Sequence, residues 1–574
     1  MSLFEKRKSS KVLLDDTTPL QCMIEAAQNV ETHIDYVIKV QRGIAPEKTW
    51  QINRRYSDFV TLHELLKITN LELPLPPKKV FGNMDREFIA ERQQSLQQYL
   101  NLILSHHLLA TSIIIKRFLD PTNYPTNLQE VALQHVSMFF RSEPYWEVVE
   151  PFRDIGWRIR KSYFLIRPKD QPKVRQILAW SDFGPDKVME DKDILQAMKV
   201  LPTIQHPYIY PVTFASANET GGFAIRTYHA TGTLRDFICK SKPKHHYLRK
   251  YCHPKSYTAF NLMNIKTYGR QILEALKFLQ EKGIPYGHLH TGNVILEGNT
   301  CRLVDIENSV LGLPCYYRDF IVQHKKINTT EAIDVYSFGH VIFEMVFGMP
   351  LNKHFKDDFP HTVPPPIKSV LESILTSESC KSGLPTVDDL IADPLFSDVS
   401  VATAPQFRLS SKLKEPLKMA KEIGVEKRLK ADQKQLSSWR RASKAHAHHN
   451  SEEEKKKRKK ASAKKRLSEQ QLSVTEGETN GATNSSTNGT ASGVSSPSST
   501  APSSPSSVPQ PPPLPVAPGS PGALPPPSLS APGSPPPPEP AATGERGALL
   551  SSIQSFSKGA LKKAVTKDCS APKL

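Results

Sequence analysis

The stretch from about residue 401 to 545 constrains this chain most, because its composition is unsuited to a hydrophobic core. It is basic at first, then rich in Ser, Thr, Asn and Gly, and from about 496 to 540 it is mostly Pro and Ser. Such sequence buries too little apolar surface to offset the entropy lost on folding. We therefore predict a disordered linker over 401–545, with the folded part of the chain before it and a short motif after it.

The net charge of +18 is concentrated in the predicted linker. Positions 408–466 hold 21 Lys and Arg against 7 Asp and Glu, which accounts for +14 of the total. The basic run at 455–460 is by default a solvated linker, and its alternatives are a nuclear signal and a tether to anionic lipids. Aromatic residues are not interleaved with these charges, so we expect no nucleic-acid binding.

The sequence predicts an intracellular chain that does not cross a membrane. Its seven Cys lack a close-paired metal spacing, which is typical of a reduced compartment. The N-terminus has no apolar signal core, and the most apolar stretch, 335–351, is short and interrupted by His340 and Glu344. We expect a cytoplasmic protein that reaches membranes only through its surface.

Residues 14–126 predict a compact domain of strands followed by helices. Alternating apolar and polar residues over 33–40 and 50–56 indicate strands with one buried face. Three features follow one another in a fixed order: the Arg-Arg-Tyr-Ser-Asp-Phe segment at 54–59, a Pro-Pro-Lys-Lys loop at 76–79, and Arg92 in an amphipathic helix. With this order and spacing the domain resembles the PX domains of sorting nexins, a three-stranded antiparallel sheet with helices.

The PX resemblance implies a phosphoinositide site. By motif position Arg55 would hold the 3-phosphate, Tyr56 would stack on the inositol ring, Lys79 or Lys78 would meet the 1-phosphate, and Arg92 would bond the ring hydroxyls. The residue types suit these roles, because a guanidinium binds phosphate with paired hydrogen bonds and Lys supplies a compact charge. For Arg54, Arg55, Lys78 or Lys79 taken alone, the favoured interpretation is an ordinary solvated surface charge. The set favours binding to 3-phosphorylated phosphoinositides.

Residues 140–400 show strand-like segments first and long helices later. They contain a Gly-His-Leu-His-Thr-Gly-Asn segment ending at Asn293, Asp305 about a dozen residues later, and an Asp-Val-Tyr-Ser-Phe-Gly segment at 334–339. In this order these motifs resemble the catalytic loop, the metal-binding Asp and the central helix of protein kinases. The resemblance implies a bilobal protein-kinase-like domain. The whole chain is thus expected to be multidomain α+β, with a disordered Pro- and Ser-rich C-terminal region.

The departures from the kinase pattern predict a pseudokinase. His288 stands where the catalytic Asp is expected, Glu307 replaces the Gly after the metal-binding Asp, and Gly156 stands alone where a Gly-rich loop is expected. The candidate third strand places Trp180 at the position of the phosphate-pairing Lys. Phosphoryl transfer depends on these parts together, so losing several removes most of the transition-state stabilisation.

Two residues at metal-ligand positions of the kinase family remain, Asn293 and Asp305. The resemblance therefore allows weak binding of ATP with Mg²⁺, although no cofactor is expected to be required. The alternative is that both side chains merely cap loops. An active atypical serine/threonine kinase stays open as the second reading of the chain, with His288 as the base and an unrecognised Lys replacing the missing one.

In the C-terminal segment 546–567, Leu549, Leu550 and Ile553 share one face of a short helix, and an extended basic Leu-Lys-Lys follows at 561–563. With these residues in this order the segment resembles the WASP-homology-2 motif, which binds monomeric actin. An apolar helix face would enter a groove on actin, and an extended basic segment would follow it. The alternative is a basic amphipathic tail that binds membranes. The Pro-rich runs before it are typical of segments that recruit profilin or Src-homology-3 domains. The residues expected to contact actin are Leu549, Leu550, Ile553, Leu561, Lys562 and Lys563.

Together these features predict an adaptor rather than an enzyme. It would bind phosphoinositide membranes, engage actin, and modulate the trafficking or activity of membrane-protein cargo at endosomal and plasma membranes. The alternative is an active serine/threonine kinase that its PX domain recruits to membranes.

Overall fold

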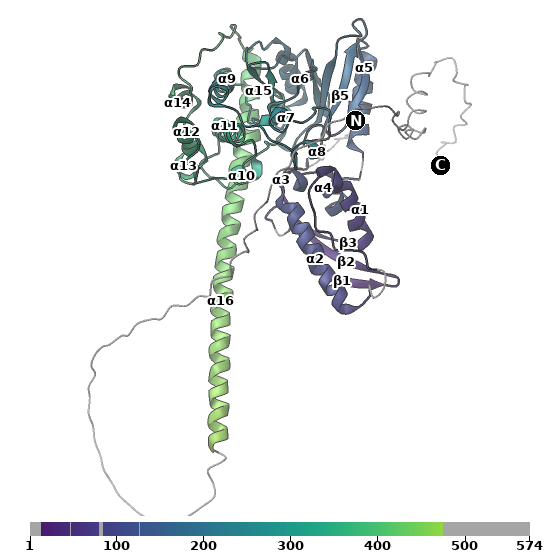
Figure 1. Cartoon of the computed structure of the whole chain (residues 1–574), viewed down its shortest axis with the longest axis vertical. Coiled ribbons are helices and arrows are strands. Elements are labelled where there is room, and N and C mark those ends of the chain that lie inside the picture. The colour runs from purple at the N-terminus through teal and green to yellow at the C-terminus, as the bar shows by residue number, and fades with distance from the viewer. Residues whose placement is uncertain (1–12, 46, 80–83, 126, 475–574) are drawn as a thin grey trace, which may run out of the picture. The chain divides into compact units, whose positions relative to one another are not determined.

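A computed structural model describes residues 13–45, 47–79, 84–125 and 127–474 (Figure 1). The first part is a three-stranded antiparallel sheet in the order β1-β2-β3, followed by helices, as the sequence predicts. Alternate residues of β2 are buried, including Tyr36 and Ile38, and they pack with Phe59 and Leu96 in one core. The elements are β1 (Leu20–Val30), β2 (His33–Arg42), β3 (Thr49–Arg55), α1 (Tyr56–Leu66), the short η1 (Lys67–Thr69), α2 (Arg86–Ser105), α3 (His107–Ala110) and α4 (Ile113–Leu119).

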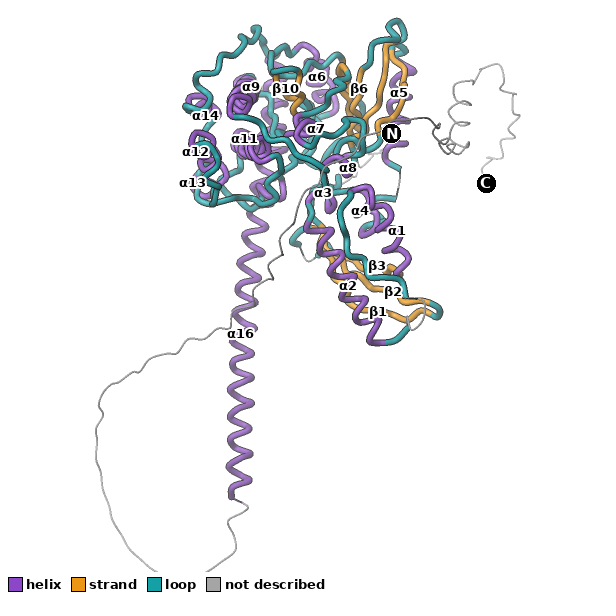
Figure 2. The backbone as a smooth tube through the Cα atoms, viewed as in Figure 1, coloured by secondary structure: helices purple, strands orange, loops and turns teal. Residues whose placement is uncertain are grey.

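A second sheet has five antiparallel strands in the order β4-β5-β6-β8-β7 (Figure 2). Helix α5 covers one face of it, where Ala132 and Val136 pack against Trp180 and Phe223. Helix α6 packs beside β7 at the edge of the sheet. The elements are α5 (Leu128–Ser142), β4 (Trp146–Phe152), β5 (Lys161–Pro168), β6 (Gln176–Asp182), α6 (Asp191–Val200), η2 (Leu201–Thr203), β7 (Phe214–Ala217) and β8 (Gly221–Thr227).

A mostly helical lobe follows, built around α9 and α11. The two helices approach closely to their neighbours through glycines: a Cβ on Gly269 would lie 2.5 Å from the ring of Phe396, and one on Gly339 2.6 Å from Ile374. The elements are α7 (Leu234–Ile238), α8 (Tyr247–Tyr251), α9 (Leu262–Glu281), η3 (Thr291–Asn293), β9 (Val294–Glu297), β10 (Thr300–Leu303), α10 (Arg318–Ile321), α11 (Thr330–Phe347), α12 (Pro365–Leu375), α13 (Ser379–Ser382) and α14 (Val387–Ala392).

The prediction of a disordered linker from residue 401 is wrong for its first part. Helix α15 (Ser411–Met419), the π-helical segment η4 (Ala420–Lys427) and helix α16 (Arg428–Val474) follow the helical lobe. Leu413, Leu417 and Leu429 are buried in the main core, and α15 packs against α6. These few apolar side chains bury enough surface to fold a segment whose overall composition is strongly polar.

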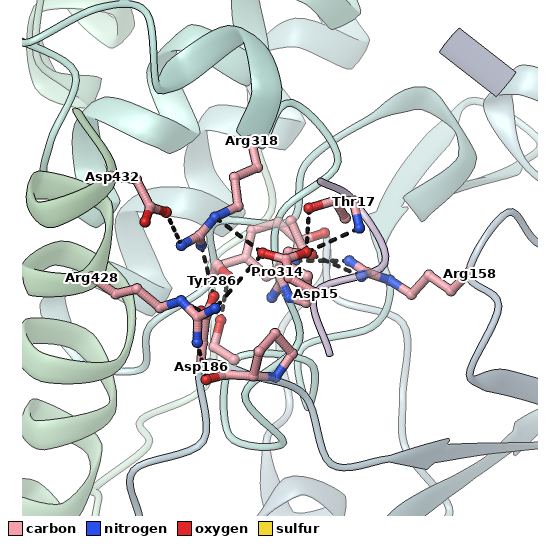
Figure 3. Close-up of polar contacts among 12 residues, drawn as sticks. Asp15, Thr17, Arg158, Asp186, Tyr286, Pro314, Arg318, Arg428 and Asp432 are labelled. Carbon is pink, nitrogen blue, oxygen red and sulfur yellow. Dashed lines mark hydrogen bonds and ion pairs between the residues drawn. The ribbon is translucent and has the colours of Figure 1, made fainter. Parts of the chain in front are cut away.

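Buried ion pairs fix this C-terminal segment to the rest of the fold (Figure 3). Arg318 lies 2.9 Å from Asp186, 2.8 Å from Asp432 of α16 and 3.6 Å from Asp15. Arg428 of α16 lies 2.9 Å from the same Asp186. A chain segment before β1, the loop after β6, helix α10 and helix α16 therefore meet in one charge cluster, which we call the Arg318 cluster.

Within the described residues, no helix is long and apolar enough to cross a bilayer.

Candidate functional site

The predicted phosphoinositide residues lie around Arg92 of α2. Its side chain is buried, and its guanidinium carbon lies 4.4 Å from the ring centre of Tyr56 and 4.1 Å from that of Phe88. Its Nη2 donates to the carbonyl of Pro77 at 3.4 Å, and its buried Nε has no hydrogen-bond partner. Tyr56 donates its hydroxyl to the carbonyl of Pro76 at 2.5 Å, so the Pro-rich loop and α2 are tied to the same centre.

Lys79 contacts this centre, whereas Arg55 and Lys78 do not; all three side chains are exposed. The Lys79 ammonium lies 4.3 Å from the Phe88 ring centre and 3.9 Å from Asp85. Arg55 ends β3 and makes an ion pair at 3.7 Å with Asp58. The structure thus brings together Tyr56, Lys79 and Arg92. The contacts of the described residues do not join Arg55 or Lys78 to them, so the expected phosphate roles of these two remain predictions.

Arg54, the neighbour of Arg55, has a structural role. Its guanidinium donates to the carbonyl of Phe118 at 2.6 and 3.1 Å and lies 5.2 Å from the Phe118 ring centre. Successive residues of a strand point to opposite faces, so Arg54 is fixed against α4 while Arg55 faces solvent.

The kinase-like domain has a cleft between the five-stranded sheet and the helical lobe. It encloses about 160 Å³. Its lining includes Ile177 and Ala179 of β6, Thr227 at the end of β8, and both predicted metal ligands, Asn293 and Asp305.

The prediction that Trp180 of β6 stands at the position of the phosphate-pairing Lys is wrong. Trp180 does not face the cleft; it lies on the opposite face of the sheet, where its ring stacks on His135 with centres 4.9 Å apart. The residue of β6 that follows Ala179 on the cleft face is Ser181, which pairs in register with Lys161 of the neighbouring strand β5.

Lys161 supplies the positive charge that β6 lacks. Its buried Nζ lies 2.9 Å from Oδ2 of Asp305, 3.3 Å from Oε1 of Glu307 and 2.9 Å from Oδ1 of Asn308. Arg226 of β8 binds the Glu307 carboxylate with two hydrogen bonds, at 2.5 and 3.2 Å. Two cations and two carboxylates thus form a closed network, which we call the Lys161 network. Sequence reasoning missed Lys161, and its only signal was a Lys at the start of an apolar strand.

The charges of this network control the protonation of its acids. Burial alone would raise the pKa of Glu307, but Arg226 and Lys161 outweigh it and hold the pKa below its usual value. Burial is likewise outweighed at Asp305, whose pKa is lowered by Lys161 and Arg226. Both carboxylates are therefore ionised at neutral pH and paired within the protein.

These contacts bear on the predicted Mg²⁺ site. The Lys161 ammonium and the Asn308 amide both approach Oδ2 of Asp305, and Asn293 uses its amide to donate to the carbonyl of His288 at 3.0 Å. Magnesium binds through carboxylate oxygens and keeps near-ideal octahedral geometry. Among the described residues no group of three or more His, Cys, Asp or Glu side chains could hold a metal ion. Oδ2 of Asp305 is thus occupied by contacts within the protein, and the expected roles of Asn293 and Asp305 toward Mg²⁺ remain predictions.

The turn between β4 and β5 enters the cleft where a Gly-rich loop would otherwise lie. Arg158 in this turn donates to the carbonyl of Pro314 at 2.8 Å and to Nδ1 of His288 at 3.1 Å. A guanidinium can only donate, so Nδ1 of His288 is the acceptor and is unprotonated. Burial, together with the charge of Arg158, lowers the pKa of His288 well below its ordinary value. The lone pair that a general base would need is already engaged.

Hydrogen bonds to neighbouring elements fix the catalytic-loop segment. The amide of Gly287 donates to buried Asp334 of α11 at 2.8 Å, and the hydroxyl of Tyr286 donates to the carbonyl of Val304 at 3.1 Å. Residues 286–288 are thus fixed in place, with a neutral His288, in contact with Arg158 of the cleft lining, in place of a carboxylate. The predicted actin-contacting residues at 549–563 lie outside the described residues.

Comparisons with known proteins agree with both recognisable modules at the ends of the chain. The PX domain family model matches residues 43–122, and the WH2 motif model matches residues 542–571. Sorting nexin-8 of Mus musculus is 34% identical over 113 residues, which cover 19% of this chain and 23% of that protein.

Longer matches extend through the kinase-like domain. "Probable inactive serine/threonine-protein kinase slob1" of Dictyostelium discoideum is 31% identical over 309 residues, 48% of this chain and 51% of that protein. "PX domain-containing protein kinase-like protein" of Mus musculus is 56% identical over 450 residues, 78% of this chain and 77% of that protein. At this identity over most of both chains, the protein belongs to the family of PX domain-containing protein kinase-like proteins.

Proposed function

We propose that this protein is a non-enzymatic adaptor that binds phosphoinositide membranes through its PX domain. Its kinase-like domain offers a protein-binding surface, and its WH2 motif binds actin. In this way it modulates the trafficking or activity of membrane-protein cargo at endosomal and plasma membranes. The observation that carries the proposal is the environment of Arg92.

Arg92 is a buried cation whose pairing is incomplete. Among the described residues no carboxylate forms an ion pair with it, and its Nε has no acceptor. Burying a charge is costly unless an opposite charge or hydrogen bonds compensate for it. The rings of Tyr56 and Phe88 compensate in part, and the hydroxyls and phosphates of an inositol headgroup would supply the missing acceptors. Exposed Arg55 and Lys78 flank this centre, where they can meet phosphates of the same headgroup.

The lipid proposal is tested by vesicle flotation of the full chain across a panel of phosphoinositides. We expect binding to vesicles that contain a 3-phosphorylated phosphoinositide and a loss of about tenfold or more in Arg55→Gln, since a charge-assisted pair is removed. Lys67→Gln is the matched control, because Lys67 is an exposed cation that pairs with Glu64 in the same domain. Equal binding by Arg55→Gln and the parent chain would refute the site.

The proposal of a non-enzymatic kinase-like domain is supported by the contact between Arg158 and His288. A general base must accept a proton, and protonating His288 would place a second positive charge against the Arg158 guanidinium. Radiolabelled phosphate transfer by the purified chain is the test, with Asp305→Ala as the comparison. Robust transfer that disappears in Asp305→Ala would instead establish the alternative, an active membrane-recruited kinase.

A second function, weak binding of a nucleotide, is favoured by one observation, the position of Lys161. Its ammonium reaches Asp305 at the cleft from β5, so the cleft keeps a Lys that could meet a phosphate. Because Glu307 competes for the charge of Lys161, we expect the nucleotide to bind weakly. Because Lys161 and Asn308 already approach Oδ2 of Asp305, we expect this binding not to depend on Mg²⁺. Thermal unfolding with and without ATP, each with Mg²⁺ and with EDTA, tests this function. A stabilisation by ATP that EDTA abolishes would contradict the Mg²⁺-independent form.

The actin function rests on the WH2 match at 542–571. We expect the full chain to inhibit actin polymerisation. Replacing Leu549 and Leu550 with Glu would remove the apolar contact with actin and should abolish this inhibition. Leu524→Glu in the Pro-rich region should leave the inhibition unchanged. Unchanged inhibition in the Leu549 and Leu550 variant would count against this function. The Pro-rich region would recruit profilin or Src-homology-3 proteins, which pull-down with purified domains can check.

A further inference from the structure

A long part of the kinase-like domain contains no acidic residue. Between Asp236 and Glu274 the chain has eight Lys and Arg and no Asp or Glu. Four of these cations have carboxylate partners: Lys244 with Glu150, Lys250 with Asp236, Lys266 with Asp398, and Arg270 with Glu274.

The other four cations lie between the end of α7 and the start of α9 and are exposed. They are Lys240, Lys242, Arg249 and Lys255, and we call them the cationic loop. Among the described residues none of them forms an ion pair with a carboxylate. Two of them act on one side chain: besides burial, the charges of Arg249 and Lys242 lower the pKa of His245, which lies between them in sequence. Like charges held this close repel one another, so the loop is poised to meet an anionic partner.

An exposed apolar patch adjoins the cationic loop. Phe237, at the start of the acid-free stretch, is 47% exposed, and its ring stacks on Phe260 with centres 5.0 Å apart. Tyr257 is 41% exposed and lies against Gly348, next to Met349, which is 50% exposed. The amide of Thr258 donates to the carbonyl of Ile238, so the two aromatic residues are held on adjoining segments. Large apolar side chains beside unpaired cations are typical of surfaces that lie in a membrane interface.

The chemistry favours a lipid surface over an acidic peptide. Three of the four cations are Lys, whose compact charge on a flexible stem suits headgroups that move laterally. Recognition of peptide carboxylates at fixed positions favours the paired donors of Arg, and the loop has only Arg249. The apolar patch would enter the interface beside those headgroups. We propose that the cationic loop and the patch of Phe237, Tyr257 and Met349 form a second membrane-contact surface, which binds anionic phospholipid bilayers without phosphoinositide.

The test is sedimentation of the full chain with phosphatidylcholine vesicles, with and without phosphatidylserine, and with no phosphoinositide present. We expect phosphatidylserine-dependent binding that weakens with salt and falls about tenfold or more in Lys242→Gln/Arg249→Gln/Lys255→Gln. Phe237→Ser should also weaken it. The matched control is Lys412→Gln/Lys414→Gln/Lys418→Gln, which removes three exposed cations from α15.

Two further variants separate this surface from other sources of binding. Arg55→Gln should leave phosphatidylserine binding unchanged, so failure of the PX proposal and failure of this one give different patterns. The loop variant is also compared in a chain with Lys455→Gln, Lys456→Gln and Lys457→Gln, because that basic helix can bind vesicles by charge alone. All substituted residues are exposed, and equal melting temperatures confirm that the variants fold.

Either of two results would overturn the proposal. The first is equal binding of phosphatidylserine vesicles by the loop variant and the parent chain in both backgrounds. The second is that a poly-glutamate peptide binds the loop as tightly as the vesicles do and displaces them, while Phe237→Ser leaves vesicle binding unchanged. That result would assign the surface to acidic protein segments.

Discussion

Nζ of Lys161 lies 2.9 Å from Oδ2 of Asp305, so strand β5 supplies the cleft with the Lys that the neighbouring strand β6 lacks. The two strands are paired in register, with Lys161 opposite Ser181, so the two side chains project from the same face of the sheet. Lys161 has a second carboxylate partner, Glu307, which also pairs with Arg226. The centre of the cleft thus neutralises its own charges.

We predict that Lys161→Met destabilises the kinase-like domain strongly. The substitution leaves Asp305 and Glu307 buried with one cation fewer, and breaking a buried pair from one side typically costs about 3–5 kcal/mol. The midpoint of urea unfolding, followed by tryptophan fluorescence, should therefore fall markedly. Lys266→Met is the control, because its pair with Asp398, whose carboxylate is exposed, should contribute no more than about 1 kcal/mol. Similar midpoints for both variants would contradict a stabilising role for the Lys161 network.

The sequence motifs predicted the order of the modules well, because short segments with fixed spacing carry that information. They could not predict Lys161. A Lys at the first position of an apolar strand is most simply read as an exposed end, and only strand pairing shows that it faces the cleft. The same limit explains Trp180. One step of strand register moves a side chain to the other face, and here that face is covered by α5, a helix placed outside the predicted domain boundary.

The pH dependence of stability should reflect a buried neutral histidine of α11. Burial lowers the pKa of His340 from 6.5 to about 3, with His324 and His107 adding smaller effects in the same direction. Below pH 6.5 the unfolded chain binds a proton that the folded chain does not take up, so stability falls as the pH falls. At one unit below 6.5 this costs about 1.4 kcal/mol from His340 alone. Urea midpoints at pH 7.5 and 5.5 measure the loss.

His340→Phe should reduce that loss. The imidazole stacks on Tyr317 with ring centres 4.3 Å apart, and its buried Nε2 has no hydrogen-bond partner, so a phenyl ring can replace it at a small cost at pH 7.5. His446→Phe, on the exposed part of α16, is the control and should leave the difference between the two midpoints unchanged. A pH response that is the same in His340→Phe as in the parent would show that other groups account for it.

The folded segment after residue 401 shows where composition misleads. Its charge indicated a linker, yet Leu413 and Leu417 lie one helical turn apart and both are buried, as is Leu429. Polar contacts complete its attachment: the amide nitrogen of Gln433 lies within hydrogen-bonding distance of the carbonyls of Ile321, His324 and Ile327. Sequence periodicity could have predicted that the leucines are buried. It could not have predicted the burial of Gln433, because that depends on the backbone carbonyls its side chain meets.

We predict that Arg318→Gln releases this segment from the helical lobe. It would remove the cation that joins Asp15, Asp186 and Asp432, and leave Asp186 with Arg428 alone. Hydrogen exchange of backbone amides over 411–436 should become faster, and limited trypsin digestion should cleave there sooner. Arg458→Gln, on the exposed part of α16, where Arg458 pairs with Glu454, should change neither. Exchange that is unchanged in Arg318→Gln would mean that the buried leucines hold the segment without the Arg318 cluster.

Exchanging the two paired positions in the cleft provides the sharpest test of how Lys161 works. Lys161→Ser should destabilise the domain as Lys161→Met does, because the same carboxylates lose their cation. Ser181→Lys in that background returns an ammonium from the adjacent strand on the same face, so the double variant should regain a large part of the lost stability.

The control for this exchange is Trp180→Lys in the same Lys161→Ser background. It places the new Lys on the opposite face, against α5, where a charge would be buried among apolar side chains and should destabilise the domain further. Urea midpoints of the three variants give the comparison. If Trp180→Lys restored stability and Ser181→Lys did not, then residue 180 would face the Asp305 carboxylate, and the strand register that brings Lys161 into the cleft would be wrong.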